Sequence, residues 1–229
     1  GHRGAATAAG VSVGKVHVYE VVDSELTLHQ TLESPNPFVA NGFGRTVTRM
    51  DDHVVIGATG MRWPGRSDRP GGLFVYERVD DTWERTASIE PPAESDLVGY
   101  WVAASDDRIA TRDYRFTGSP RVLVYERTPE GWEFAQAIET SDGLDLDDFF
   151  GIGLAMDGQW LAIGAYRDDS LVTIGGSVRL YRLGPDGLYE PFQDIIGVEE
   201  GGQLGVSMAI DGDDLFVGAL SADRQEDGQ

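Results

Sequence analysis

The sequence contains no cysteine and no long apolar run, and it has far fewer basic than acidic residues. Without cysteine it can form no disulfide, thiolate-bound zinc site or thiol nucleophile. No apolar run reaches the roughly 18 residues that a membrane-spanning helix needs, and the first residues do not form a signal peptide. The 39 acidic and 18 basic residues give a net charge of −21, which makes nucleic acid and membrane insertion poor expectations.

Catalytic motifs are also missing. The four histidines, His2, His17, His29 and His53, have no zinc-type spacing. There is no Gly-x-Ser-x-Gly elbow and no phosphate-binding glycine loop. We therefore predict that the protein is not an enzyme.

What the sequence does contain is an internal repeat. Thirty glycines and ten prolines separate short β-branched and aromatic segments, which indicates many strands joined by tight turns. An apolar strand containing a tyrosine recurs at intervals of about 54 residues, at Tyr19, Tyr76, Tyr125 and Tyr181. After a short polar turn a second strand follows each tyrosine strand, beginning near Leu26, Trp83, Trp132 and Tyr189.

Two further strands complete each unit. One begins with an apolar residue and glycine, and the next ends in Gly-Ala in three of the four copies. Four short antiparallel strands in a repeated unit are typical of a propeller blade. We predict an all-β fold, a β-propeller of four-stranded antiparallel blades with about four blade equivalents in the chain. Residues 1–229 then form a single domain, with repeats at approximately 14–71, 72–120, 121–176 and 177–229.

These pieces resemble the FG-GAP repeat of integrin α-subunit-like propellers. The resemblance lies in Phe43-Gly44 with Gly57-Ala58, Phe150-Gly151 with Gly164-Ala165, and Leu204-Gly205 with Gly218-Ala219. It implies a propeller in a secreted or cell-surface protein. In the family's strand order the chain opens with the last two strands of a blade and closes with the first two. We therefore expect residues 14–33 to pair with residues 203–219, within one chain or between two. A closed four-blade ring, a homodimer of half-rings and a fragment of a longer propeller all remain open.

Many FG-GAP blades bind calcium in an Asp-rich loop between their first two strands. The corresponding turns here are shorter, at Asp51-Asp52, Asp106-Asp107, Asp157-Gly158 and Asp211-Gly212. A calcium ion needs several converging oxygens, so these aspartates are interpreted as turn residues and no cofactor is expected. A denser cluster, Asp142, Asp145, Asp147 and Asp148, is either a weak cation site or a solvated acidic loop.

The second repeat departs from the others. Trp101 stands where the other copies have Thr46, Gly153 and Ser207, and Thr111-Arg112 is aligned with their Gly-Ala pair. This pattern indicates either a blade specialised for binding or ordinary degeneration of a repeat.

The leading functional hypothesis is a non-catalytic module that binds a protein or carbohydrate through the long loops at one face. Long loops on a rigid scaffold commonly carry recognition, and aromatic and arginine side chains dominate binding hot spots. The candidate binding residues are Trp63, Trp101, Arg112, Tyr114, Arg115 and Tyr166. The alternatives are a propeller hydrolase or lyase that uses axial carboxylates, and a structural repeat module of a large surface protein.

Overall fold

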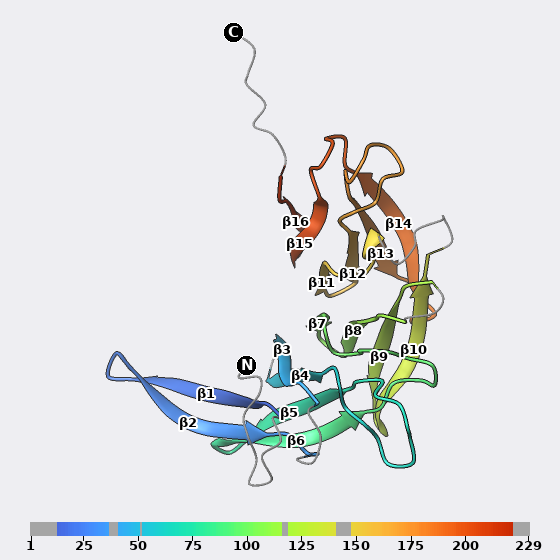
Figure 1. The fold of residues 1–229 in the computed structure, drawn as a ribbon. Helices are drawn as coiled ribbons and strands as arrows, with labels where there is room; N and C mark the ends of the chain where they lie inside the picture. The colour runs from blue at the N-terminus through green and yellow to red at the C-terminus, as the bar shows by residue number, and fades with distance from the viewer. Residues whose placement is uncertain (1–12, 37–40, 51, 116–118, 141–147, 222–229) are drawn as a thin grey trace.

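The protein is an array of antiparallel β-sheets (Figure 1). The computed structural model describes residues 13–36, 41–50, 52–115, 119–140 and 148–221. These residues form 16 strands and no α-helix, which confirms the all-β prediction. None of them belongs to a helix long and apolar enough to cross a membrane.

Three of the sheets are complete, with four strands each in chain order across the sheet. The first contains β3 (Phe43–Met50), β4 (His53–Ala58), β5 (Leu73–Val79) and β6 (Thr82–Ile89). The second contains β7 (Val102–Ser105), β8 (Arg108–Asp113), β9 (Arg121–Thr128) and β10 (Gly131–Glu139). The third contains β11 (Leu154–Asp157), β12 (Trp160–Ala165), β13 (Ser177–Leu183) and β14 (Tyr189–Ile196).

The two remaining sheets are two-stranded and lie at the ends of the array. One is the hairpin of β1 (Lys15–Val22) and β2 (Glu25–Glu33), and the other joins β15 (Leu204–Asp211) to β16 (Asp214–Ala219). The expected pairing of residues 14–33 with residues 203–219 is therefore wrong within one chain. The reason is the curvature of the array: β1–β2 projects from the first sheet, and β15–β16 lies against the third (Figure 1). Pairing between two chains stays a prediction.

The sheets follow one another along an arc, with the first strand of each sheet on the inner side (Figure 1). β3, β7, β11 and β15 are neighbours from sheet to sheet. The apolar core consists of layers between successive sheets, because each sheet buries both faces in its middle strands. Tyr125, for example, is buried between the first and second sheets.

Two glycine motifs set the spacing between sheets. Gly44, Gly99, Gly151 and Gly205 of the Phe-Gly-type motifs all have φ between 82° and 91°, a region that disfavours residues with a Cβ atom. A Cβ atom on Gly57 would lie 2.0 Å from the carbonyl oxygen of Gly99, and one on Gly164 would lie 2.1 Å from that of Gly205. The Gly-Ala glycine of one sheet thus contacts the Phe-Gly glycine of the next.

Glutamines on the outer strands form a second contact between sheets. The Gln30 side chain donates to the carbonyl oxygen of Trp83 (3.0 Å) and accepts from its amide (2.7 Å). Gln136 forms the same pair with Tyr189, at 3.0 and 2.8 Å. Each glutamine satisfies an amide and a carbonyl at a free sheet edge. We call this two-bond contact the glutamine latch.

Candidate functional site

The departure in the second sheet is larger than the sequence comparison indicates. Arg112 lies opposite Val122, as Gly57 lies opposite Leu73 and Gly164 opposite Val178. The earlier alignment of Thr111-Arg112 with Gly-Ala is therefore wrong by one residue. Arg112 occupies the glycine position and Asp113 the alanine position.

Arg112 therefore stands where the other two junctions have a contact between two glycines. A Cβ atom on Gly151 would lie 3.1 Å from Cγ of Arg112, so the arginine stem packs directly on the Phe-Gly motif of the third sheet. Arg112 is 1% exposed, and the three nitrogens of its buried guanidinium have no hydrogen-bond partner among the described residues. Burial lowers the pKa of Arg112 to about 10, while Tyr114, Tyr166 and Asp113 act in the opposite direction. The side chain therefore stays cationic at neutral pH.

Aromatic rings surround this cation. The guanidinium carbon is 4.8 Å from the ring centroid of Tyr114, 5.3 Å from Trp101 and 5.9 Å from Phe149. Tyr166 stacks at a tilt on Phe149, with 5.2 Å between centroids. All four rings are half-buried, so they enclose the charge and also present a surface. We call Arg112 and these four rings the Arg112 cluster.

Arginine–aromatic stacking continues on both sides of the cluster. Trp101 stacks on Tyr100 at 3.9 Å, and the Arg45 guanidinium lies 3.4 Å from the Tyr100 centroid. On the other side, the Arg167 guanidinium lies 5.3 Å from Phe149. Alternating cations and rings thus run from the first sheet across the second to the third. Each such contact contributes about 0.5–2 kcal/mol, depending on its desolvation.

The other two candidate residues lie outside the cluster. Trp63 stacks on Phe74 and donates its indole N–H to the carbonyl oxygen of Gly71 (2.8 Å), so it supports the first sheet. Arg115 lies 3.8 Å from carboxylate oxygens of Glu94 and Glu139. The structure thus brings together Trp101, Arg112, Tyr114 and Tyr166, but not Trp63 or Arg115.

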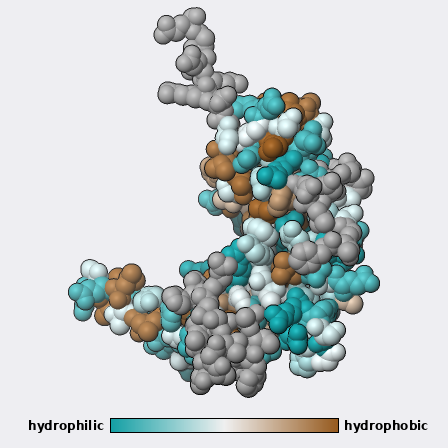
Figure 2. All heavy atoms as spheres, in the orientation of Figure 1, coloured by the Kyte–Doolittle hydropathy of each residue, from teal (hydrophilic) through white to brown (hydrophobic). Residues whose placement is uncertain are grey.

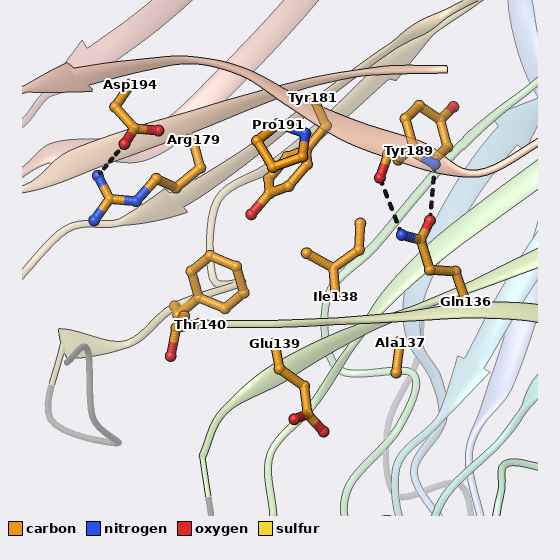
Figure 3. A pocket seen from close by; sticks show the side chains of 11 residues that line it. Gln136, Ala137, Ile138, Glu139, Thr140, Arg179, Tyr181, Tyr189, Pro191 and Asp194 are labelled. Atoms are coloured by element: carbon orange, nitrogen blue, oxygen red, sulfur yellow. Dashed lines mark hydrogen bonds and ion pairs between the residues drawn. The ribbon is translucent and has the colours of Figure 1, made fainter. Parts of the chain in front are cut away.

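A pocket of about 280 Å³ opens at the same junction, between β10 and the outer strands of the third sheet (Figure 3). The glutamine latch of Gln136 lies at one end and the ion pair of Arg179 with Asp194 (3.4 Å) at the other. Asp168, which is buried, lies 3.5 Å from Arg179. Arg179 therefore pairs with two acids, whereas the Arg112 guanidinium has no ion pair among the described residues.

Asp168 is held in its charged form. Burial alone would raise its pKa, but the Ser170 amide, which donates to the carboxylate (2.8 Å), the nearby Ser177 hydroxyl and the charge of Arg179 together lower the pKa below its ordinary value. Its role is therefore to anchor the loop after β12 to β13.

The predicted cation cluster lies mostly outside the described residues, which include Asp148 but not Asp142, Asp145 or Asp147. In the turns, the Asp157 carboxylate accepts a hydrogen bond from the Gly212 amide of the next sheet (2.7 Å), so it joins two turns. Elsewhere Glu20, His29 and Asp81 come together. The Arg78 guanidinium donates hydrogen bonds to the carboxylates of Glu20 and Asp81, and a metal cation is not expected beside this positive charge.

The sequence analysis missed the cluster member Phe149 and the flanking residues Arg45, Tyr100 and Arg167. A signal for Phe149 existed. It is an aromatic residue directly before Phe150-Gly151, at the position where the other copies have Gly42, Leu97 and Gln203. Counting from the Asp-Asp turns would also have found the correct position of Arg112. It lies five residues after Asp107, as Gly57 lies five after Asp52.

Comparison with known families supports one part of the chain directly. Residues 132–181 match the FG-GAP repeat family, from the start of β10 to β13. This stretch includes Phe150-Gly151 and Gly164-Ala165, the motifs that carried the resemblance, and it spans the junction where the Arg112 cluster lies. No curated protein matches the sequence.

Proposed function

We propose, on the premise that residues 132–181 carry an FG-GAP repeat, that the protein is a non-catalytic binding module built on propeller-type blades. Its partner is a protein or glycan that bears carboxylates, and the Arg112 cluster recognises it. The observation that carries the proposal is the buried Arg112 guanidinium, whose three nitrogens have no partner among the described residues.

An unpaired buried cation is costly. Burial of a charge without a hydrogen-bonded counter-charge costs several kcal/mol, and contacts with aromatic rings, at about 0.5–2 kcal/mol each, offset part of this cost but supply no hydrogen bond. The first and third sheets have glycine at this position, so the repeat packs without a charged side chain there. A carboxylate would satisfy the guanidinium through two parallel hydrogen bonds, the geometry that arginine favours.

The surroundings suit an acidic ligand. The chain carries a net charge of −21, and Arg45, Arg112 and Arg167 place positive charges along the cluster. Trp101, Tyr114 and Tyr166 offer flat, half-buried rings with few rotatable bonds, which is typical of recognition surfaces. Because three rings lie within 6 Å of the guanidinium carbon, ligand entry requires one of them to rotate aside.

Secretion or display at the cell surface belongs to the same proposal. It rests on the FG-GAP repeat alone. Detection of the protein in the culture medium or on intact cells of its source would test this part.

The binding test uses calorimetry with three probes: a polyuronate, its neutral polysaccharide counterpart, and a glutamate-rich peptide. We expect binding of at least one carboxylate probe and none of the neutral one. Arg112→Met should weaken that binding about 10- to 100-fold, because a charged bidentate contact contributes roughly 1.5–3 kcal/mol.

Arg85→Met is the matched control, because Arg85 is an exposed arginine on β6 with no part in the cluster. It removes the same charge and should leave the affinity unchanged. Equal loss in both variants would show that binding depends on net charge alone. Binding that is unaffected by Arg112→Met would place the site elsewhere.

A further inference from the structure

We propose that β16 of one copy pairs with β1 of a second copy, so that two half-sheets complete a four-stranded sheet between chains. This inference concerns assembly and does not depend on the Arg112 cluster. It rests on a comparison within the chain, in which three complete sheets show what the two incomplete ones lack.

The missing strands are complementary. In each complete sheet the second strand pairs antiparallel with the third, as β4 does with β5, β8 with β9 and β12 with β13. β15–β16 corresponds to the first two strands and β1–β2 to the last two. Among the described residues β16 and β1 each keep one edge unpaired, and such edges favour pairing with another chain.

The complete sheets also fix the register. Gly57 lies opposite Leu73 and Gly164 opposite Val178. Gly218 is the equivalent glycine of β16, and Val16 precedes Tyr19 as Leu73 precedes Tyr76. The same pairing therefore places Gly218 opposite Val16, Val217 opposite His17 and Phe216 opposite Val18.

Side chains that are core in the complete sheets are exposed in the half-sheets. Tyr19 is 54% exposed, whereas its equivalents Tyr76, Tyr125 and Tyr181 are between 1% and 9% exposed. Phe216 is 61% exposed, whereas Val55 at the equivalent position is fully buried. Figure 2 shows apolar residues in brown on the projecting β1–β2 hairpin. Pairing would return both half-sheets to the burial that the other sheets have.

The third sheet offers a place for the incoming hairpin. A groove of about 190 Å³ lies between its outer strands and β15–β16, lined by Trp160, Leu180, Phe192 and Leu215 among others. Gln193 is the latch glutamine of this sheet, since it lies opposite Leu180 as Gln136 lies opposite Val124. Its side chain is exposed and has no partner among the described residues. The incoming β2 would present the backbone of Leu26, the equivalent of Tyr189, to this latch.

A second copy is the occupant because the same chain supplies both halves. The two ends lie apart along one arc (Figure 1), so one chain does not bring them together. Two copies related by a two-fold axis form two identical junctions, each with β16 from one chain and β1 from the other. Such closed symmetry is the commonest form of homo-oligomer.

The first test is the mass in solution by sedimentation equilibrium. We expect a species of twice the 24.9 kDa of one chain, which dissociates on dilution. Phe216→Asp should weaken the dimer roughly 30-fold or more, since it removes a large apolar contact and buries a charge. Phe134→Asp is the control, because Phe134 is also an exposed phenylalanine on a strand but lies on β10. A monomer at every concentration up to the solubility limit would overturn the proposal, as would equal weakening by both variants.

The second test uses the absence of native cysteine. A Phe216→Cys chain is mixed with a Val18→Cys chain and oxidised. Directly opposite residues in a sheet have Cβ atoms about 5 Å apart, close enough for a disulfide, whereas a shift of three residues adds about 10 Å. We expect a cross-link between these two chains and much less between Phe216→Cys and Val21→Cys.

Two results would overturn the register or the partner. Equal cross-linking of both mixtures would contradict the register. A double variant that carries both Val18→Cys and Phe216→Cys distinguishes pairing between two chains from pairing within one chain. An internal disulfide in monomeric chains, without cross-linking in the mixture of single variants, would show that one chain closes on itself.

Discussion

At the scale of the residue, one substitution changes a junction between two sheets. Where the other two junctions have a glycine, the second sheet has Arg112, and its guanidinium lies among rings with no hydrogen-bond partner in the described part of the chain. Residues that serve recognition commonly reduce stability, because they hold groups ready for a partner that is absent from the free protein.

Arg112→Met should therefore stabilise the protein while it weakens binding. Methionine keeps much of the stem that packs on Gly151 and removes the unpaired charge, and exchange of a buried charge for an apolar group stabilises by about 1 kcal/mol or more. The measurement is the free energy of unfolding in urea. Arg85→Met is the control, and its free energy of unfolding should lie within about 0.5 kcal/mol of the wild-type value. A loss of stability in Arg112→Met would mean that the guanidinium has a counter-charge in the chain.

Asp168 gives a pH-dependent expectation. Its pKa in the folded protein is lowered below the value of about 3.9 for an unfolded chain, so its charge stabilises the fold above that pH. This contribution is lost as the pH falls through the folded-state pKa. Asp168→Asn should reduce the free energy of unfolding by about 1–3 kcal/mol near pH 7, since a buried partner of Arg179 is lost.

The difference between wild type and Asp168→Asn should shrink below about pH 4. Urea denaturation at several pH values measures it, and Asp169→Asn, the exposed neighbour, serves as control. A difference that stays constant from about pH 3 to pH 7 would show that the charge of Asp168 does not stabilise the fold.

At the scale of the element, the glutamine latch is the contact that outer strands share. It occurs from β2 to β6 and from β10 to β14, but the second sheet receives none, because Ala87 of β6 occupies the glutamine position. The register supports this equivalence, since Ala87 lies opposite Val75 as Gln136 lies opposite Val124.

Removal of a latch should therefore lower the free energy of unfolding, and addition of a latch should raise it. Gln136→Ala should lower the free energy of unfolding by about 1–2 kcal/mol, because an amide and a carbonyl of Tyr189 lose their partner. Ala87→Gln should raise it by about 0.5–1.5 kcal/mol, through a new latch to Trp132. Thermal or urea unfolding measures both. Destabilisation by Ala87→Gln would mean that β6 and β10 are spaced differently from the latched pairs.

Strands and their order were predictable because they depend on local signals. Alternating apolar residues, Asp and Gly turns and the recurring Tyr76-type strand specify each hairpin without reference to distant parts of the chain. The latch was not predictable, because a single glutamine has no pattern that distinguishes a sheet contact from a solvated side chain.

At the scale of the whole molecule, charge and assembly act against each other. Two copies that each carry a net charge of −21 repel each other. The proposed register also places Asp214 of β16 opposite Glu20 of β1. In the first sheet the equivalent pair is His53 and Glu77, which lies next to the pair of Val54 and Tyr76. Salt screens such repulsion over about 10 Å at 0.1 M.

Dimerisation should therefore strengthen as the salt concentration rises. We expect the dissociation constant to fall several-fold between about 0.05 and 0.5 M sodium chloride, where the Debye length falls from well above to below the span of a side-chain pair. Asp214→Asn should reduce this dependence, and Asp186→Asn, in the exposed turn before β14, should leave it unchanged. Weaker association at high salt would show that attraction between charges holds the copies together.

The sequence by itself determined the repeat, the strand types and the two half-units at the ends, because hydrophobic alternation and turn residues act over a few positions. It also pointed to the second repeat as the one that differs. Only the tertiary structure decided that Arg112 takes the glycine position, that Phe149 and Tyr166 join it from the third sheet, and that Trp63 does not. It also decided that the ends stay apart. These outcomes depend on the strand register and on the angle between successive sheets. Both are set by many small packing contacts along the whole chain.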